Sequence, residues 1–320
     1  MKYYFAPMEG ITGYIYRNAH HKFFNNVDAY YTPFLVPTQN RKFTSREKND
    51  ILPEHNEGLR TIPQIMTNQW EGFLWTAQEL KKYGYQEVNL NLGCPSRTVV
   101  SKQRGSGFLA VPDQLDQFLD RIFSLDMKIS IKTRIGIDSP DEFYRLMEIY
   151  NKYPLEELII HPRIQKDFYR NTPNWDSFKM AVSVSKNPVC YNGDIFTPKD
   201  YERLMQTFPT VERVMLGRGL VTNPMLSGEI QGNGCLKKEP LKEFHDQILS
   251  GYQETISGDR NVLFKMKELW AYLIISFENG EKLGKKIQKS QNIMDYMSAV
   301  EELFRNLELE STLDISGSRY

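Results

Sequence analysis

The chain has 320 residues, of which 40% are hydrophobic and 25% charged, and its 40 basic side chains balance 40 acidic ones. This length allows one large globular domain beside a smaller one, and no stretch comes near the ~20 consecutive apolar residues of a membrane span. The zero net charge argues weakly against a nucleic-acid partner, because phosphate binding normally rests on an excess of Lys and Arg.

Eight short apolar runs recur about every 20 to 35 residues, and each has the length of a β-strand. They lie at residues 3–7, 28–32, 62–66, 87–91, 128–134, 157–161, 188–191 and 212–216. The first run begins almost at the N-terminus, so we expect no signal peptide. The lack of a long apolar stretch predicts no membrane partner.

Amphipathic segments with helical spacing lie between these runs, at residues 72–83, 112–124, 140–153, 175–185 and 198–208. Pro112, Pro140 and Pro198 lie near the starts of three of them, where a helix tolerates Pro. Eight strands that alternate with helices predict an α/β fold, a (β/α)8 TIM barrel. A doubly wound open sheet is the alternative.

The strand pattern stops at a linker over residues 231–241, and three amphipathic helical stretches follow at 241–256, 261–277 and 287–307. We therefore expect a barrel domain over 1–232, an all-helical bundle domain over 241–308 and a loose C-terminal tail over 309–320. Between Arg260 and Lys289 seven basic residues face three acidic ones, with aromatic residues interleaved. This stretch is either the solvated face of a bundle or a surface for a phosphate backbone.

Polar residues lie at or just beyond the ends of the predicted strands, where (β/α)8 barrels carry their chemistry. The sets are Pro7-Met8-Glu9-Gly10, Gln64, Asn91 with Cys94, Lys132 with Arg134, His161 with Arg163, Asn192-Gly193-Asp194 and Gly217-Arg218-Gly219. Charge inside a buried strand is costly unless it is paired or used. Taken singly, each charged residue could belong to a structural ion pair, and His161 could be a hydrogen-bonded core histidine. Taken together, the residues predict one active site.

Three cysteines without framework spacing favour a reducing compartment, here the cytoplasm. Cys94 lies in the turn Asn91-Leu92-Gly93-Cys94-Pro95, which presents its thiol outward, and we expect it to be functional. Cys190 lies inside an apolar run and is expected to be a buried packing residue. The sequence has no Cys-x-x-Cys or His-x-x-x-His pair, so no metal site is expected.

The glycine-containing loops 192–194 and 217–219, after the seventh and eighth strands, predict a phosphate site, with Arg218 adding a charge. The alternative is two tight turns that need glycine. Residues 105–110 match G-x-G-x-x-A, with Asp126 about 20 residues on, but the preceding strand ends too early for a dinucleotide motif. We interpret these glycines as the end of a loop that carries Cys94 and Lys102.

A phosphorylated cofactor, with Lys132 on the fifth strand and Gln64 on the third, fits flavin mononucleotide (FMN). Gln64 could supply both a donor and an acceptor to the pyrimidine edge of the flavin, and Lys132 could stabilise negative charge on the reduced ring. A thiol with an ordinary pKa near 8.5 could donate a proton while the flavin delivers hydride. Hydride and proton added to a polarised C=C bond make a reduction.

With these residues in place, the chain resembles the tRNA-dihydrouridine synthase family over about its full length. The residues that carry the likeness are Ala6-Pro7-Met8-Glu9-Gly10, Gln64-Ile65, Asn91-Leu92-Gly93-Cys94-Pro95, Lys102, Gly105, Gly107, Lys132-Thr133-Arg134, His161-Pro162-Arg163, Asn192-Gly193-Asp194-Ile195 and Gly217-Arg218-Gly219. The resemblance implies an FMN enzyme that uses NADPH to reduce the C5=C6 bond of uridines in tRNA. Hydride would pass from flavin N5 to C6, and Cys94 would protonate C5.

The resemblance also implies a role for each matching residue. Pro7, Met8 and Glu9 would line the flavin, although Glu9 replaces the small residue common in the family. Gln64 and Lys132 would contact its ring, and its ribityl phosphate end would be held by Asn192, Gly193, Asp194, Gly217 and Arg218. His161 would contact the flavin, while Asn91, Lys102 and Arg163 would contact the substrate.

The resemblance implies that the target uridine is flipped into the pocket while the helical domain binds the tRNA. We expect the protein to be a monomer. The alternatives are another FMN barrel that acts on a pyrimidine, similar to dihydroorotate dehydrogenase, or a tRNA-binding protein that has lost catalysis.

Overall fold

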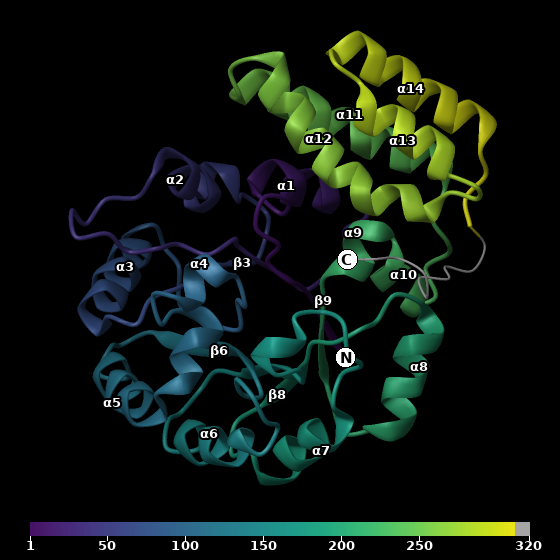
Figure 1. Cartoon of the computed structure of the whole chain (residues 1–320). Coiled ribbons are helices and arrows are strands. Elements are labelled where there is room, and N and C mark those ends of the chain that lie inside the picture. The colour runs from purple at the N-terminus through teal and green to yellow at the C-terminus, as the bar shows by residue number, and fades with distance from the viewer. Residues whose placement is uncertain (311–320) are drawn as a thin grey trace.

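The computed structural model describes residues 1–310 of the chain, and a parallel barrel with a helical bundle on one side makes up its architecture (Figure 1). The strands are β1 Lys2–Phe5, β2 Ala29–Tyr31, β3 Thr61–Ile62, β4 Gln64–Ile65, β5 Glu87–Leu92, β6 Lys128–Arg134, β7 Leu158–His161, β8 Val189–Tyr191 and β9 Arg213–Leu216. They form one sheet in the order β3-β2-β1-β9-β8-β7-β6-β5-β4. The predicted barrel is confirmed.

The third predicted strand is interrupted at Pro63, which has no N–H to give to the sheet. β3 pairs with β2, and β4 pairs with β5, so residues 61–65 join the two edges of the sheet. A parallel bridge between Leu35 and Ile65 adds to this closure. The barrel is therefore nearly closed, and the open-sheet alternative is wrong.

Helices surround the strands. The five predicted ones are α3 Trp70–Lys82, α5 Pro112–Ile122, α6 Glu142–Tyr150, α7 Trp175–Val184 and α8 Pro198–Thr207. Pro112 and Pro198 are the first residues of α5 and α8, as helix starts favour. Five more were not predicted, namely α1 Tyr14–Phe23, α2 Ser45–Ile51, α4 Arg97–Val100, α9 Arg218–Thr222 and α10 Leu226–Ile230.

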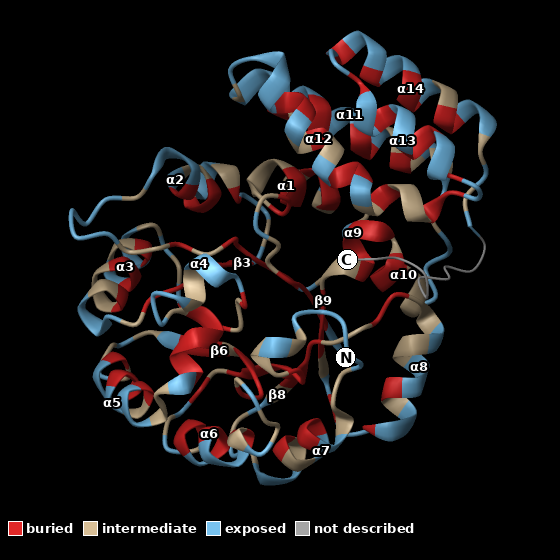
Figure 2. Cartoon of the chain, in the orientation of Figure 1, coloured by how far each residue is buried: buried red, intermediate tan, exposed pale blue. Residues whose placement is uncertain are grey.

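The strand residues are mostly buried (Figure 2), and a cluster of buried side chains fills the barrel interior. Cys190 lies there in a cluster with Tyr4, Tyr31 and Met215, and it is fully buried. The prediction that Cys190 is a packing residue is confirmed. The remaining apolar core lies between the strands and the surrounding helices.

Four helices follow the barrel: α11 Lys238–Thr255, α12 Asp259–Leu273, α13 Glu281–Lys289 and α14 Ile293–Asn306. The predicted single helix over 287–307 is wrong, because α13 ends at Lys289 and Asn292 begins a new helix by accepting a hydrogen bond from the N–H of Asp295. Apolar residues continue at helical spacing across this break, so a prediction from periodicity alone did not separate the two helices.

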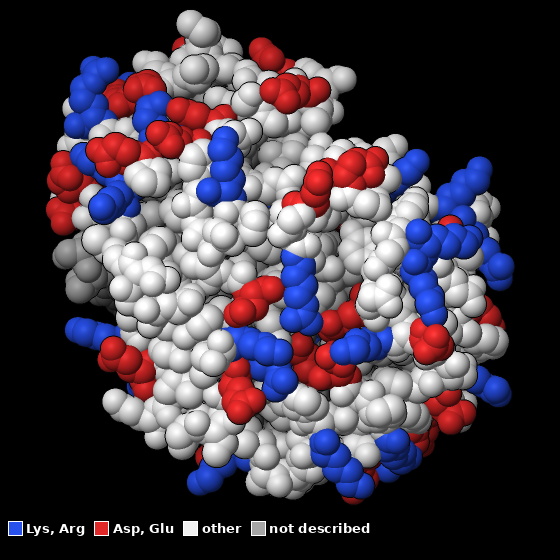
Figure 3. Space-filling view, turned by 180° about the vertical axis from the view of Figure 1, so that it is seen from behind, with Lys and Arg blue, Asp and Glu red and all other residues white. Residues whose placement is uncertain are grey.

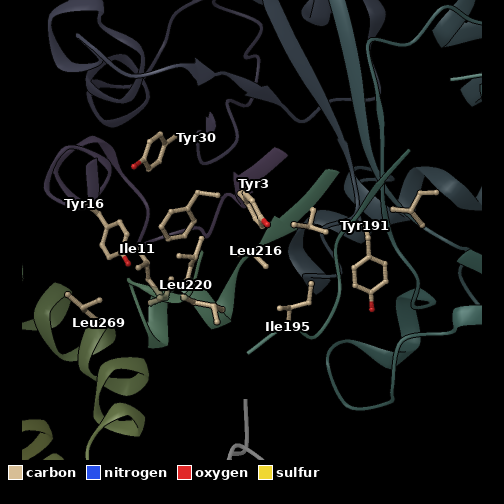
Figure 4. Close-up of a cluster of buried hydrophobic side chains, with 14 of the residues drawn as sticks. Tyr3, Ile11, Tyr16, Tyr30, Tyr191, Ile195, Leu216, Leu220 and Leu269 are labelled. Atoms are coloured by element: carbon tan, nitrogen blue, oxygen red, sulfur yellow. The ribbon is translucent and has the colours of Figure 1, made fainter. Parts of the chain in front are cut away.

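The bundle contacts the barrel along α1 and α9, through α11 and α12 respectively. In Figure 4, Leu269 of α12 lies in one apolar cluster with Ile11, Tyr16 and Leu220 of the barrel part. Within residues 1–310, no helix is long and apolar enough to cross a membrane.

The predicted loose tail over 309–320 begins with two residues that the structure places. Leu309 forms an antiparallel bridge with Phe277, and the N–H of Glu310 donates to the carbonyl of Ser276 at 2.9 Å. Residues 311–320 lie outside the described part of the chain. The domain boundaries at 232 and 241 remain a prediction.

Candidate active site

A cavity of about 400 Å³ lies at the carboxyl ends of the barrel strands, within the size range of small-molecule sites. The predicted site residues that line it are Pro7, Met8, Glu9, Gln64, Asn91, Cys94, Lys132, His161, Asn192, Gly193, Asp194, Gly217 and Arg218. The strand ends therefore bring these residues together as the barrel topology requires. Their individual roles remain predictions.

Two predicted site residues do not line the cavity. Lys102 is exposed on the loop after α4, where its carbonyl accepts a hydrogen bond from Asn68 Nδ2 at 3.2 Å. Arg163 is 1% exposed and lies behind the lining residues, with Nη1 donating to His161 Nε2 at 2.9 Å. Arg163 is therefore placed to position other groups.

The turn that carries Cys94 is shaped by Asn91, whose Oδ1 accepts from the N–H groups of Gly93 and Cys94 at 3.0 Å each. The carbonyl of Cys94 accepts from the N–H and the hydroxyl of Ser106. A Cβ at Gly105 would lie 2.8 Å from that carbonyl, so this glycine is needed for the loops to pack. The 105–110 segment is a 3-10 helix that follows α4, not a strand, which agrees with rejecting a dinucleotide motif.

The Cys94 thiol is partly buried, and burial raises its pKa above the ordinary value. A hydrogen bond from the backbone of Ser96 and the positive charge of Arg134 lower the pKa in part, while Glu9 raises it further. The thiol is therefore protonated at neutral pH and can act as a proton donor.

Gln64 and Asn91 belong to a buried amide network at the barrel floor. Asn91 Nδ2 donates to Gln64 Oε1 at 2.6 Å, Gln64 Nε2 donates to Asn89 Oδ1 at 2.8 Å, and Asn89 Nδ2 donates to Ser130 Oγ at 3.0 Å. Each amide orientation is thereby fixed. Gln64 retains one N–H and one lone pair for a ligand.

Four cations gather at the strand ends: Lys132, Arg134, Arg163 and Arg218. Burial, followed by repulsion from Arg134, lowers the pKa of Lys132 to about 8. Burial and all four cations hold the pKa of His161 well below its usual range, so His161 is neutral and its Nε2 accepts from Arg163. Such a positive region favours an anionic ligand.

Asp194 is the carboxylate that lies among these cations. Its Oδ1 accepts from Arg163 Nη1 at 3.1 Å and from Arg218 Nη2 at 2.7 Å. Asp194 therefore offsets part of the positive charge of these two arginines. Gly193 is required by packing, since a Cβ there would lie 2.1 Å from the hydroxyl of Tyr191.

Sequence reasoning missed three polar residues that line the cavity: Tyr169, Glu268 and Tyr272. The Tyr169 ring lies 4.8 Å from the guanidinium of Arg218 and 5.4 Å from that of Arg134, both cation–π contacts. Glu268 and Tyr272 come from α12 of the bundle. No local pattern marks them, because only tertiary packing brings α12 to the barrel mouth.

Residues 4–308 match the family described as dihydrouridine synthase (Dus). The chain belongs to this family. The predicted family, and with it the predicted enzyme class of oxidoreductase, is confirmed, and the match favours this interpretation over a dihydroorotate dehydrogenase-like barrel.

Similar proteins support the assignment, one of them over nearly the full length of the chain. A probable tRNA-dihydrouridine synthase of Staphylococcus aureus is 22% identical over 326 aligned residues, covering 97% of this chain and 95% of that protein. The tRNA-dihydrouridine(16) synthase of Pseudomonas putida is 28% identical over 234 residues, 70% of this chain and 72% of that protein. The tRNA-dihydrouridine synthase B of Vibrio vulnificus is 27% identical over 222 residues, 66% of either chain.

Solved structures share the fold at low identity. Morphinone reductase has a TM-score of 0.52 and 12% identity, and the match covers 74% of this chain and 87% of that one. Histamine dehydrogenase from Rhizobium sp. 4-9 has a TM-score of 0.55 and 10% identity, and the match covers 84% of this chain and 49% of that one. These matches confirm the barrel.

Proposed function

We propose that this chain reduces the C5=C6 bond of uridine in tRNA, with FMN as its cofactor and NADPH as the reductant. One observation carries the proposal: a thiol whose burial keeps it protonated opens onto the same cavity as the basic side chains Lys132, Arg134 and Arg218. Proton donation and anion binding are the two properties that a flavin-dependent reduction of a double bond requires from the protein.

The lining residues fit FMN. Lys132 has no hydrogen bond or ion pair with any residue in 1–310, so its ammonium is available to a ligand. Arg218 and the backbone of Gly217 suit a phosphate, and the remaining donor and acceptor of Gln64 suit the pyrimidine edge of the ring. When bound and reduced, FMN would supply the hydride that adds to C6.

The protein's own groups would control the proton. Cys94 holds it at Sγ and donates it to C5, and Asn91 fixes the turn that aims the thiol. The charges of Arg134 and Lys132, which favour the deprotonated form of Cys94, would stabilise the thiolate until it is protonated again. Arg163 would position His161 and Asp194 from behind.

The bundle supplies a surface for tRNA. A groove between α13 and α14 is lined by Lys282, Lys285, Lys286 and Lys289, against Glu281 and Asp295. Four ammonium groups along one groove favour a phosphate backbone. On the face turned away from the viewer in Figure 1, acidic and basic side chains are interspersed (Figure 3). We propose that the charge needed for RNA is concentrated locally in a neutral chain.

The proposal is tested with the purified protein. We expect a flavin absorption spectrum that NADPH bleaches. After incubation with NADPH we expect dihydrouridine in previously unmodified tRNA, found by mass spectrometry. A protein that remains colourless after reconstitution with FMN would contradict the cofactor. A flavoprotein that NADPH bleaches but that leaves every uridine intact would contradict the substrate.

We propose a monomer, because one active site meets one tRNA, and a cytoplasmic location, because three cysteines without framework spacing favour a reducing compartment. Light scattering of the purified protein tests the monomer, and fractionation of cells tests the location.

A further inference from the structure

Helix α12 brings a carboxylate to the mouth of the cavity, and the barrel fixes its position. Lys265, one turn before Glu268, donates from Nζ to the carbonyl of Gly10 at 2.8 Å. The carboxylate lies against Gly10, where a Cβ would be 2.7 Å from Oε1, and the φ of +86° at Gly10 also favours glycine. Leu269 anchors the same turn in the apolar cluster of Figure 4.

Glu268 differs from the other carboxylates that line the cavity in its free capacity to accept hydrogen bonds. Asp194 is engaged by two arginines, and Glu9 is paired with Arg46. The nearest cation to Glu268 is Lys265, 3.6 Å from Oε2, and no residue within 1–310 donates a hydrogen bond to it. A carboxylate with unused lone pairs is a strong acceptor for a ligand N–H.

Glu268 also occupies a different depth from the groups expected to hold the flavin. The Gln64 side chain is fully buried at the floor, whereas the Glu268 side chain is 46% exposed at the rim. A nucleobase that enters from outside meets the rim first. The carboxylate is therefore placed for the base of the substrate.

Uracil offers one donor on its pairing edge, the N3–H group between its two carbonyl oxygens. Cytosine has a lone pair at N3, which an acceptor-only carboxylate repels. We propose that Glu268 accepts a hydrogen bond from N3–H of the target uracil, and so selects a base that carries a proton at this position. This inference rests on the proposed function. Specificity of this kind is strong because the wrong base leaves a polar group unpaired.

The test compares tRNAs that carry either uridine or N3-methyluridine at the target position, with the full-length flavin-loaded protein. The wild type should reduce uridine ~10- to 100-fold faster than N3-methyluridine, the span of a hydrogen bond to a charged group. In Glu268→Ala the rate on uridine should fall and the ratio between the substrates should shrink to about threefold or less. In the isosteric Glu268→Gln, whose amide oxygen accepts a weaker hydrogen bond, the ratio should lie between those of Glu268→Ala and the wild type. Glu243→Gln, on an exposed face of α11, is the matched control and should keep the wild-type ratio.

The possible results distinguish a failure of the proposed function from a failure of the role proposed for Glu268. A wild type that forms no dihydrouridine overturns the proposed function, and this inference falls with it. An active wild type whose substrate ratio survives in both Glu268 variants overturns this inference alone. A changed FMN dissociation constant with an unchanged ratio would assign the carboxylate to the cofactor and also overturn it.

Discussion

The two ends of the barrel both hold buried ionisable groups, but the surroundings of Cys94 and Lys132 differ from those of Glu157. At the carboxyl end, Cys94 and Lys132 line an open cavity. At the amino end, Glu157 is buried among the aromatic and sulfur-containing side chains that fill the barrel, and Tyr31 donates to its Oε1 at 3.3 Å. Burial raises the pKa of Glu157 to about 7, with Glu87 contributing. A perturbed pKa therefore marks a functional site only when it coincides with a cavity.

The two cysteines of the barrel give the largest expected contrast. Burial raises the pKa of both thiols, but only Cys94 opens onto the cavity. Cys94→Ala should lower the rate of dihydrouridine formation by ~10²- to 10⁴-fold, the usual contribution of a general acid. Cys190→Ala should keep the rate and lower the free energy of unfolding by ~1 kcal/mol, the cost of a small cavity.

Rates on unmodified tRNA and urea unfolding check this contrast, with FMN binding as evidence that each variant is folded. Equal loss of activity in both variants would refute the assignment of the proton donor to Cys94.

Glu157 provides the corresponding test at the amino end. Its folded pKa lies above the unfolded value of 4.5, so its stabilising contribution is complete below pH 4.5 and is lost as the pH rises through about 7. Glu157→Gln cannot ionise. From pH 5 to pH 8 the variant should gain up to roughly 3 kcal/mol in free energy of unfolding relative to the wild type, from the size of the pKa shift.

Urea unfolding at the two pH values measures this gain. Glu156→Gln is the control, because Glu156 pairs with the exposed Lys128. The catalytic rate should be unchanged in both variants. A pH-independent difference between Glu157→Gln and the wild type would contradict the assigned titration.

Lys132 and Lys128 lie on the same strand, β6, at opposite ends of the barrel. Lys132→Met should weaken the binding of FMN by ~10- to 100-fold through loss of one charged partner, and Lys128→Met should leave it unchanged. Because the pKa of Lys132 is about 8, its ammonium is present below that pH and is lost above it. Wild-type affinity for FMN should therefore fall as the pH rises through 8.

Fluorescence titration with FMN between pH 6 and pH 9.5 checks this prediction. The fall above pH 8 should disappear in Lys132→Met. If the variant keeps the same pH dependence, another group controls the binding.

The part of the site built by the barrel was predictable from sequence, because the position of a residue along its strand decides at which end of the barrel it lies. Each strand is a short apolar run, and the residues in or just beyond its carboxyl-terminal part must lie at the same end of the barrel as those of the other strands. This placed Gln64, Asn91, Cys94 and Lys132 around one cavity. Arg163 follows a strand as well, but its side chain turns behind His161, and strand position alone does not give side-chain direction.

The part of the site built by the bundle was not predictable in this way. Glu268 and Tyr272 lie on α12 at ordinary helical spacing, and they were counted only in the charge and the aromatic content of a basic stretch. Their position depends on how α12 packs against the loop after β1. The boundary between α13 and α14 was missed for a related reason, because Ile287 and Ile293 continue the apolar pattern while the backbone breaks between them.

The smallest expected effect compares the basic groove of the bundle with the barrel surface. Lys282→Ala with Lys285→Ala removes two exposed ammonium groups from the groove, and Lys179→Ala with Lys186→Ala removes two from the barrel side. If both groove lysines contact phosphates, tRNA affinity should fall severalfold and the slope of log affinity against log salt should decrease by about 2. Filter binding between 50 and 200 mM salt measures both quantities. The Lys179→Ala, Lys186→Ala variant should change the tRNA affinity and the salt slope only by the general effect of a lower net charge. An equal loss of affinity in both double variants would mean that total charge attracts tRNA and that the groove has no special role.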